Sequence, residues 1–540
     1  MNSKPARDAA YGDDAPIAAF ATPLAESALA IIRTSGGSSA GSPGSIELLS
    51  QVFSRPQKLL SAPGNSVVHG WIVENSNTTD NSVTAFRRID EVLISVYRSP
   101  RSYTGEDGAD ISCHGGIAAA KAVMGALKAA GFRDALSGEF TFRAFMNGKL
   151  DLTRSESVME LVSAKTDQGR EHAVNRLSGA LEQEITGIKN LLVQVLAETE
   201  IYLDYSEDEF VGTASGTPGA ATDEAAGRFP GHAAAEEARV RLQALAASYR
   251  RERLYQEGAL TVIAGRPNAG KSSLFNLLLK EDRSIVTEAP GTTRDWIEAL
   301  VSIEGIPVRL ADTAGLRDLL ADSAGAYSSA PLDPVEKIGI ERSRELLAQA
   351  DLVLYVINGA EGITAEDRAF LDEFGDDTDK KTSMLILWNK ADIAIAPETL
   401  SLKKKNFNRK VKEAAQSKEA EQGAAVLPVS AKTGAGIPTL TAAIAGTLTA
   451  AASGSPLGNT AHDGGGMEHS PGIATARQKE LVDAALAAVT ETLLLAGKGE
   501  PLDLIAPLLR EAVNSLGEIT GEVSTVDILE TMFSRFCIGK

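Results

Sequence analysis

Cysteine is scarce in this chain of 540 residues, and aromatic residues make up only 5% of it. The two cysteines, Cys113 and Cys537, cannot build a disulfide framework, which favours a reducing compartment. The sequence also lacks an apolar run of about 18 residues, the length that a helix needs to cross a membrane. We therefore expect a soluble, cytoplasmic protein with no membrane partner, whose cores are packed mostly by aliphatic side chains.

Positive charge is also in short supply, because 53 lysines and arginines face 72 aspartates and glutamates, giving a formal net charge of −19. This balance argues against nonspecific nucleic-acid binding over the whole surface, without excluding a local basic site. The N-terminal stretch contains Asp8, Asp13 and Asp14 and lacks an apolar core. It therefore resembles neither a secretory signal nor an arginine-rich transit peptide.

The N-terminal part mixes strand-like and helix-like patterns. Residues 15–35 predict two short apolar strands around a turn, and residues 66–74 and 89–98 predict two further strands. A helical run follows at residues 117–130. Residues 1–148 are therefore expected to form an α+β domain.

Long amphipathic helices are predicted in two separate stretches, residues 149–255 and 473–540, where apolar residues recur at three- and four-residue spacing. Within the first, residues 211–229 are rich in Gly, Ala and Thr and predict a loop or insertion. Between the two stretches, strands and helices alternate over residues 256–450, as in a doubly wound α/β domain. Residues 451–472 read as a low-complexity linker. We expect an all-α domain interrupted by an inserted α/β domain.

A phosphate-binding loop is predicted in the sequence GRPNAGKS, residues Gly265–Ser272, which lies between a strand-like and a helix-like run. The backbone N–H groups of such a loop and the N-terminus of the next helix can hold phosphate oxygens. Lys271 is placed to reach the β- and γ-phosphates, and the Ser272 hydroxyl is placed to bind Mg²⁺. A glycine-rich turn also arises by composition alone, so the loop needs supporting elements.

Two supporting elements predict the metal and the γ-phosphate contacts. APGTTRD contains Thr292 and Thr293, which can form a switch loop with Thr293 as a second Mg²⁺ ligand. Asp312 ends the strand-like run 306–312 in DTAG, and Gly315 can offer its N–H to the γ-phosphate. The strand before it is joined through a tight turn predicted at Glu304-Gly305.

Two further elements predict the base contacts. NKAD ends another strand, and its Asp392 carboxylate can accept two N–H bonds from guanine that adenine cannot supply. SAK, residues 430–432, ends the last strand and can close over the base. The order of all these elements predicts GTP rather than ATP. The predicted GTP-binding residues are Asn268, Ala269, Gly270, Lys271, Ser272, Ser273, Thr292, Thr293, Asp312, Thr313, Ala314, Gly315, Asn389, Lys390, Asp392, Ser430, Ala431 and Lys432.

Leu316 follows DTAG, at the position where Ras-like enzymes have a Gln that orients the attacking water. An apolar side chain cannot orient water, so hydrolysis needs another residue for this role and another source of positive charge. Asn268 can help to coordinate a monovalent cation near the phosphates, or it can simply stabilise the turn of the loop. The residues alone leave both alternatives open.

Motifs at both ends of the chain narrow the choice among GTPases. The N-terminal part contains SYTGED (Ser102–Asp107), CHGG (Cys113–Gly116) and GEFTFRAFMNGKLDLTRSES (Gly138–Ser157), and the chain ends in FCIGK (Phe536–Lys540). The GTP elements resemble the translation-factor-related class of small GTPases. Together with the terminal motifs they closely resemble the tRNA modification GTPase MnmE, or TrmE, family, over nearly the whole chain.

That resemblance implies an N-terminal folate-binding domain that also drives homodimerisation, and a helical domain split by a Ras-like GTPase domain. It implies a flavoprotein partner, MnmG or GidA, that carries FAD and joins in a heterotetramer, and a tRNA substrate. The implied reaction adds a carboxymethylaminomethyl or aminomethyl group at C5 of the wobble uridine. Its one-carbon unit comes from 5-formyl- or 5,10-methylene-tetrahydrofolate, its amine from glycine or ammonia, and GTP hydrolysis is stimulated by K⁺.

The resemblance also implies roles for particular residues. The folate contacts are Arg33, Asp110, Lys149 and Lys540, with Asp110 standing where the family has Glu. A pterin and a glutamyl tail suit an acidic acceptor and basic donors. The potassium ligands are Asn268, Thr287, Ala289 and Thr292, and Thr287 thereby joins the GTP-binding residues. The water-positioning acid is Glu336, which would take the role that Gln has in Ras-like enzymes, where this chain has Leu316. Alternatively, Glu336 is an ordinary solvated residue in the first turn of a helix.

Three weaker signals keep their alternatives. Cys537 is either a thiol close to the one-carbon unit or a small buried side chain. His114 beside Cys113 is expected to be structural, since no second Cys/His cluster accompanies it. The basic run 402–412 either contacts tRNA phosphates or is a solvated insertion.

Two rival functions remain at this stage. The first is a ribosome-assembly GTPase, which shares the phosphate-loop sequence but leaves the FCIGK terminus unexplained. The second is a binding or scaffold protein that uses GTP only as a switch. A folate site would separate the second rival from the implied reaction.

Overall fold

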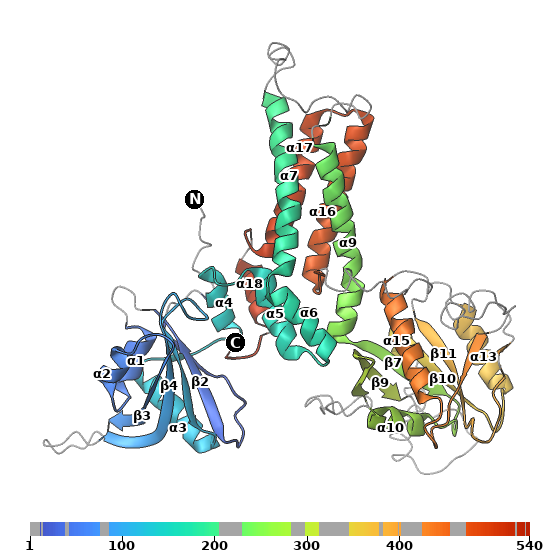
Figure 1. Ribbon diagram of the computed structural model, residues 1–540, viewed down its shortest axis with the longest axis horizontal. Helices are drawn as coiled ribbons and strands as arrows, with labels where there is room; N and C mark the ends of the chain where they lie inside the picture. Colours follow the sequence, from blue (N-terminus) through green and yellow to red (C-terminus); the bar gives the residue numbers. More distant parts are fainter. Residues whose placement is uncertain are drawn as a thin grey trace, which may run out of the picture. The chain divides into compact units, whose positions relative to one another are not determined.

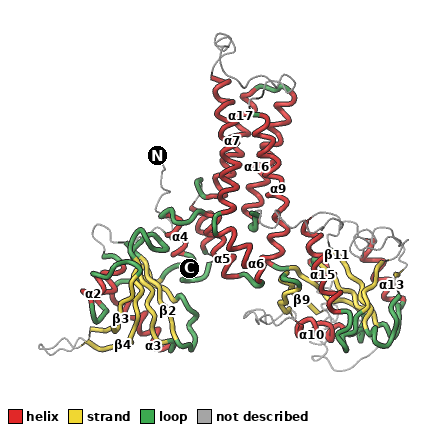
Figure 2. The backbone as a smooth tube through the Cα atoms, viewed as in Figure 1, coloured by secondary structure: helices red, strands yellow, loops and turns green. Residues whose placement is uncertain are grey.

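The computed structural model of the protein describes residues 11, 15–37, 43–75, 86–204, 229, 231–281, 298–312, 345–376, 382–397, 399–400, 424–453, 471–523, 526–534 and 536–539. Its contacts divide the chain into two compact units. The first unit holds Met1–Met159, Leu177–Val193 and Arg510–Lys540, and the second holds Glu160–Arg176 and Gln194–Leu509. Each unit contains one β-sheet (Figures 1 and 2).

The first unit contains a six-stranded sheet in the order β3-β4-β5-β2-β1-β6. Its strands are β1 (Ile17–Phe20), β2 (Leu29–Ser35), β3 (Ser66–Asn75), β4 (Phe86–Tyr97), β5 (Gly108–His114) and β6 (Arg133–Asp134). The four strands expected in residues 15–35, 66–74 and 89–98 are confirmed as β1 to β4. The strand β5 is not among the expected strands, although its apolar residues Ala109, Ile111 and Cys113 alternate with polar ones and are buried.

One face of this sheet is buried under helices, because strand residues alternate between the two faces. Ile32, Ile94 and Ile111 point to this side and pack with Val123 and Leu127 of α3 (Ile117–Ala130) in a single core. The helices α1 (Ser45–Gln51) and α2 (Pro56–Leu60) complete the cover. The helix α3 has the bounds expected from the sequence, and Gly131 ends it in the left-handed conformation.

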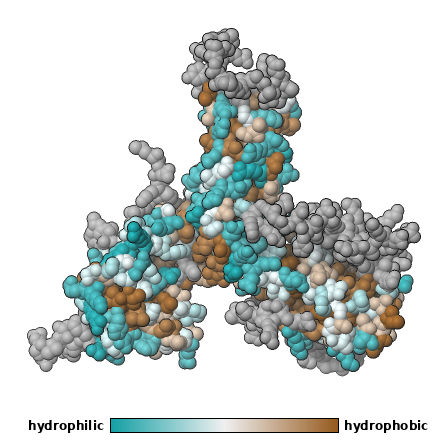
Figure 3. Space-filling view, viewed as in Figure 1, coloured by the Kyte–Doolittle hydropathy of each residue, from teal (hydrophilic) through white to brown (hydrophobic). Residues whose placement is uncertain are grey.

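The other face of the sheet is only partly covered. Val67, Leu93 and Leu29 are exposed on it by 62%, 49% and 59%, and hydrophobic side chains gather over these strands in Figure 3. The helix α4 (Glu139–Met146) covers the β1 end, where its Phe140 packs with Ile17. The open part of the face therefore lies beside a helix that carries one of the N-terminal sequence motifs.

Long helices form in the two stretches where amphipathic periodicity predicts them. They are α5 (Leu152–Ser163), α6 (Asp167–Leu177), α7 (Ala180–Asp204), α9 (His232–Glu257), α16 (Ala476–Lys498), α17 (Leu502–Thr520) and α18 (Val526–Phe533). Within the second unit α9 packs against α16, whose N-terminus is capped by Thr475 in a capping box with Gln478. No helix in the described ranges combines the length and apolar character that a membrane span requires.

The second unit contains a seven-stranded sheet in the order β12-β13-β11-β10-β7-β9-β8. Its strands are β7 (Ala259–Gly265), β8 (Glu298–Ile303), β9 (Ile306–Asp312), β10 (Leu352–Asn358), β11 (Ser383–Asn389), β12 (Thr399–Leu400) and β13 (Ala424–Pro428). The five central strands are parallel. The turn at Glu304-Gly305 is confirmed, and both residues have a positive φ, as a two-residue hairpin turn of this kind requires.

Helices cover both faces of this sheet, as expected for a doubly wound domain. The helices α10 (Lys271–Glu281) and α15 (Ile437–Ser453) pack on one face, and α13 (Ala365–Asp376) packs on the other. Helix α9 continues to Glu257 and α15 to Ser453, so the helical segments extend slightly beyond the residues at which the sequence placed the domain borders. The domain borders themselves stay a prediction.

A buried ionic cluster lies where the helices of the second unit meet. The Arg176 guanidinium donates to Glu252 Oε2 at 2.6 Å and to Glu160 Oε2 at 2.7 Å. His172 Nδ1 lies 2.8 Å from Glu252 Oε2, and its ring stacks on Tyr255. The side chains of Arg176, Glu160 and Glu252 are at most 4% exposed. The cluster therefore ties α5 and α6 to the C-terminal part of α9, just before β7 begins.

Candidate functional site

The phosphate loop begins at the end of β7 and leads into α10. Gly265, Asn268 and Gly270 have φ values of 140°, 60° and 93°, so the chain turns through conformations that most side chains disfavour. The Lys271 ammonium donates to the carbonyl oxygen of Arg266 at 2.9 Å and is largely buried. The lysine thus lies across its own loop, with its charge held at the site where phosphates would bind.

Ser272 and Asp312 come together at the edge of the second sheet. The Ser272 hydroxyl donates to Asp312 Oδ2 at 2.8 Å, and Asp312 is only 4% exposed. The two residues meet because β7 and β9 are parallel neighbours whose C-terminal ends lie at the same edge. A hydroxyl and a carboxylate oxygen at this spacing form the hard oxygen donor set that Mg²⁺ prefers.

Asn389 links the base-binding elements to the phosphate loop. Its Nδ2 donates to the carbonyl oxygen of Ala269 at 2.7 Å, and its Oδ1 accepts from the N–H groups of Ala431 and Lys390 at 3.0 and 2.8 Å. Its side chain thus holds NKAD, SAK and the phosphate loop together. The carbon that a side chain at Gly270 would add collides with this amide, so glycine is required there.

Asp392 and Ser430 form the second contact between the base-binding elements. The Ser430 hydroxyl donates to Asp392 Oδ1 at 2.7 Å. This hydrogen bond lowers the pKa of Asp392, against a small opposing effect of burial. The carboxylate is therefore ionised and partly fixed in direction, with acceptor capacity left for a ligand.

Arg33 and Asp110 form a two-point ion pair on the open face of the first sheet. Arg33 Nε donates to Asp110 Oδ1 at 2.9 Å, and Nη2 donates to Oδ2 at 3.2 Å. The two are direct register partners of β2 and β5, which places them on the same face. Burial alone would lower the pKa of Arg33, but the hydrogen bond and charge of Asp110 raise it. The guanidinium is thus held in its charged form.

The C-terminal segment reaches this ion pair. Arg33 Nη1 donates to the carbonyl oxygen of Gly539 at 3.5 Å. Ile538 pairs with Ser137 in an isolated bridge, and the N–H of Gly138 donates to the carbonyl of Cys537 at 3.4 Å. The FCIGK and GEFTF motifs, which are far apart in sequence, therefore meet beside Arg33.

Two protein-family models match the parts of the chain that contain these sites. The family model described as the MnmE helical domain matches residues 152–537, and the model described as the GTP-binding protein TrmE N-terminus matches residues 16–149. The tRNA modification GTPase MnmE of Treponema denticola is 39% identical over 97% of this chain and 98% of its own length. The chain belongs to the MnmE family of tRNA modification GTPases.

Further MnmE relatives agree with this assignment. The protein of Borreliella afzelii is 36% identical over 98% of this chain and 98% of its own length, and that of Carboxydothermus hydrogenoformans is 36% identical over 97% and 99%. Among solved structures, Aquifex aeolicus Era is 24% identical over 43% of this chain and 66% of its own, with a TM-score of 0.24.

Several of the predicted site residues lie outside the described part of the chain. They are Thr287, Ala289, Thr292, Thr293, Thr313, Ala314, Gly315, Glu336 and Lys540. Leu316, the basic run 402–412 and all but one residue of the insertion 211–229 lie outside it as well. The roles predicted for these residues stay predictions. The structure describes the other two predicted residues, Ser273 and Lys432, and both are exposed. Ser273 follows the phosphate loop, and Lys432 follows β13.

Lys149, which is predicted to contact folate, makes its hydrogen bond to a backbone carbonyl group. Its Nζ donates to the carbonyl oxygen of Pro100 at 3.0 Å, in the loop that precedes β5. Asn147 Nδ2 donates to the carbonyl oxygen of Thr104 in the same loop at 2.7 Å. No contact joins Lys149 to Arg33 or Asp110 among the described residues, so its predicted role depends on the reach of its flexible side chain.

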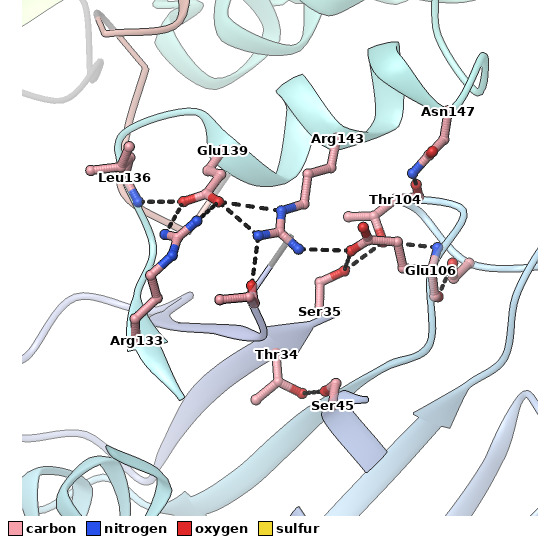
Figure 4. Close-up of polar contacts among 12 residues, drawn as sticks. Thr34, Ser35, Ser45, Thr104, Glu106, Arg133, Leu136, Glu139, Arg143 and Asn147 are labelled. Atoms are coloured by element: carbon pink, nitrogen blue, oxygen red, sulfur yellow. Dashed lines mark hydrogen bonds and ion pairs between the residues drawn. The ribbon is translucent and has the colours of Figure 1, made fainter. Parts of the chain in front are cut away.

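A buried polar network that the sequence did not indicate anchors this loop to α4 (Figure 4). Arg143 donates to Glu106 at 3.0 Å and to Glu139 at 2.9 Å, and Arg133 also pairs with Glu139. Glu106 accepts from the Ser35 hydroxyl at 2.8 Å. Glu106 lies within SYTGED, and Glu139 and Arg143 lie within GEFTFRAF, so an acidic residue in the first motif and a basic residue in the second were the available signal. The loop is fixed by paired charges, which buried positions require.

The structure shows the surroundings of the two cysteines and of His114. Cys537 is exposed, so the alternative of a small buried side chain is wrong. Cys113 is buried, and burial together with the nearby charge of Asp90 raises its pKa to about 11. His114 Nδ1 lies 2.6 Å from Asp90 Oδ1. The described residues contain no group of three or more His, Cys, Asp or Glu side chains placed to hold a metal ion.

Proposed function

We propose that the protein is a potassium-stimulated GTPase that acts on tRNA, with a tetrahydrofolate derivative as one-carbon donor, to modify C5 of the wobble uridine. A flavoprotein of the MnmG type acts as its partner and carries the FAD, and the protein works as a homodimer in the cytoplasm. Membership of the MnmE family supports the GTPase and tRNA assignments. The potassium, folate and partner assignments are the finer part of this proposal.

The observation that carries the folate part is the Arg33–Asp110 ion pair with the C-terminal Gly539 carbonyl beside it. A folate offers carboxylates to a guanidinium and pterin N–H groups to a carboxylate, so this donor and acceptor set fits it. Asp110 uses two of its roughly four acceptor positions for Arg33 and a third for a 3.5 Å contact from the Tyr97 hydroxyl, which leaves one for a ligand. The bound tetrahydrofolate would supply the one-carbon unit, while Arg33, Asp110, Lys149 and Lys540 hold it.

Asp110 is shorter than the Glu of the family and still serves as an acceptor. Because it is a direct register partner of Arg33 on the neighbouring strand, the short side chain suffices for a two-point ion pair. The departure from the family pattern therefore preserves the charge pair. It shortens the reach of the carboxylate toward a ligand above the sheet.

In the GTPase part, Ser272 and Thr293 would bind Mg²⁺, with Asp312 beside them, and Lys271 would neutralise phosphate charge. The hydroxyl and carboxylate at 2.8 Å support this assignment. Potassium would be held by Asn268, Thr287, Ala289 and Thr292, and would supply transition-state charge near the phosphates. The positive φ of Asn268 shows that its backbone shapes the loop, a role compatible with a cation-binding side chain. Glu336 would orient the attacking water.

GTP turnover of the purified full-length protein in potassium buffer, compared with sodium buffer of equal ionic strength, tests the proposal. Activation by potassium alone, together with binding of 5-formyltetrahydrofolate that Arg33→Ala abolishes, is the expected result. Equal rates in both buffers without folate binding would overturn the finer proposal and favour a ribosome-assembly GTPase. A loss of turnover in Glu336→Ala with GTP binding intact is expected from the water-positioning role, and unchanged turnover would remove it.

A further inference from the structure

Two tyrosines flank the Arg33–Asp110 ion pair, and no role has been assigned to either. Tyr97 ends β4 and lies two residues after Ser95, the register partner of Asp110, so it shares the open face with that carboxylate. Its hydroxyl donates to Asp110 Oδ2 at 3.5 Å. Tyr103 lies in the SYTGED loop before β5, and its phenol interacts electrostatically with Arg33.

Electrostatic coupling places both phenol groups near the Arg33 guanidinium. Burial raises the pKa of Tyr103, while its hydrogen bond to Thr141 and the charge of Arg33 oppose this rise. Burial is likewise the largest cause of the raised pKa of Tyr97, with the Asp110 charge adding to it and Arg33 opposing it. Arg33, Asp110 and Tyr97 therefore form one contact cluster, and the Tyr103 phenol is close enough for the Arg33 charge to affect it.

The Tyr103 ring is fixed at its tip, and part of its surface remains open. Its hydroxyl lies 2.9 Å from the Thr141 hydroxyl of α4, so the polar end of the side chain is satisfied by the protein. The residue is nevertheless 41% exposed. A tyrosine that served only to fill a core would bury more of its ring, whereas an anchored, exposed ring is a preformed surface for a ligand.

The loop that carries Tyr103 is held rigidly against α4 and the residues after it. Arg143 pairs with Glu106, Asn147 holds the carbonyl of Thr104, and Ser35 contacts both Thr104 and Glu106 (Figure 4). The same β2 strand that supplies Ser35 supplies Arg33 two residues earlier, on the same face. The polar network therefore fixes Tyr103 relative to Arg33, which is the preorganisation that a binding site needs.

We propose that Tyr103 is a binding residue of this N-terminal site, whose ring contacts the flat aromatic part of a folate-type ligand while Arg33 and Asp110 bind its polar groups. An ion pair alone gives a conjugated ring system no apolar surface, and small-molecule sites combine a few polar groups with such surface. The Tyr97 hydroxyl adds a weak contact of 3.5 Å to the same Asp110 carboxylate. The inference rests on the folate part of the proposed function.

The test measures binding of 5-formyltetrahydrofolate to the full-length protein by titration calorimetry. Tyr103→Phe keeps the ring and is expected to bind within about twofold of the unsubstituted protein. Tyr103→Leu removes the ring and is expected to raise the Kd about tenfold, the size of a lost aromatic contact. Tyr202→Leu, which replaces a 53% exposed tyrosine on α7, is the matched control and is expected to leave the Kd unchanged.

The outcomes separate this inference from the proposed function. If the unsubstituted protein binds no 5-formyltetrahydrofolate, the folate part of the proposed function fails. If it binds and Tyr103→Leu binds equally well, the folate assignment stands and the role of Tyr103 is overturned. Circular dichroism shows whether Tyr103→Leu is folded. If Tyr103→Leu is not folded, a second measurement on the unsubstituted protein takes its place. It detects saturation transfer between the ring protons of a labelled Tyr103 and the aminobenzoyl protons of bound 5-formyltetrahydrofolate. The absence of this transfer overturns the role of Tyr103.

Discussion

The side-chain amide of Asn389 donates a hydrogen bond to the carbonyl oxygen of Ala269, with 2.7 Å between the two atoms. The contact joins residues 120 positions apart, because β7, β10 and β11 are parallel neighbours that end at the same edge of the sheet. Ligands of doubly wound sheets bind at this edge. Asn389, the first residue of the base-binding motif NKAD, therefore also sets the shape of the phosphate loop.

This contact predicts that Gly270→Ala impairs GTP binding. The added carbon collides with the Asn389 amide, and Gly270 has a φ of 93°, a conformation that costs other residues about 1–2 kcal/mol. We expect GTP affinity to fall at least about tenfold, measured by titration with a fluorescent GTP analogue.

The control for this substitution is Gly446→Ala. Gly446 lies within α15 with open space around the added carbon, and alanine is the better helix former by about 0.8–1.0 kcal/mol. GTP affinity should stay unchanged and the midpoint of thermal unfolding should not fall. Equal GTP affinity in Gly270→Ala and Gly446→Ala would contradict the role of the Asn389 contact.

Asp392→Asn is expected to change base specificity. The Ser430 hydrogen bond fixes one oxygen of the carboxylate and lowers its pKa, leaving an ionised acceptor for guanine. Each hydrogen bond to a charged group contributes about 1.5–3 kcal/mol, so the loss should weaken GTP binding about 100-fold. Xanthosine triphosphate, which offers a carbonyl where guanine has an amine, should gain affinity because Asn can donate to it.

Competition binding of the two nucleotides measures this change. Asp372→Asn on α13 removes the same charge from the same domain and should leave both affinities as they are. A uniform loss of both nucleotides in Asp392→Asn would show damage to the fold in place of a specificity change.

The sequence predicted most of the second sheet and its turn, because these depend on local signals. Buried strands β7, β10 and β11 are continuous apolar runs, and Glu304-Gly305 is a turn pair that needs only its own backbone geometry. The phosphate loop was recognisable for the same reason.

The contacts of the N-terminal site could not be predicted from local patterns. Arg33 and Asp110 are 77 residues apart, and they meet through the pairing of β2 with β5, which the sequence alone does not reveal. The Gly539 carbonyl lies 506 residues from Arg33 in sequence. The family resemblance named Arg33 and Asp110 as partners of one ligand, whereas Tyr103 and the Arg143 network required the fold.

The two cysteines are expected to differ strongly in reactivity. Cys537 is exposed, whereas Cys113 is buried with a pKa raised to about 11, so only about 0.001 of its thiol is ionised at pH 8. Iodoacetamide should modify one thiol in the native protein and both after denaturation, as measured by peptide mass spectrometry. Cys537→Ser should abolish the fast reaction, and rapid labelling of Cys113 in the native state would contradict its burial.

Glu252→Gln is expected to destabilise the protein in a pH-dependent manner. Burial alone would raise the pKa of Glu252, but hydrogen bonds from His172 and Arg176 and their charges hold it below its ordinary value. Such a depressed pKa stabilises the fold fully above the unfolded-chain pKa of about 4.3, and this contribution is lost as the pH falls through the folded value. Removing one partner of a buried pair costs about 3–5 kcal/mol.

The midpoint of thermal unfolding, followed by circular dichroism at neutral pH and below pH 4, measures this effect. At neutral pH the Gln variant should unfold about 6–20 °C below the unsubstituted protein. In acid the two midpoints should converge, because a protonated Glu252 and a Gln equally deprive the buried Arg176 of one of its two acidic partners, Glu160 being the other. Glu236→Gln, in the exposed Glu236–Arg239 pair of the same helix, should change the midpoint little at either pH. If Glu252→Gln lowers the midpoint by the same amount at both pH values, the lost stability comes from packing, and the charge of Glu252 does not contribute.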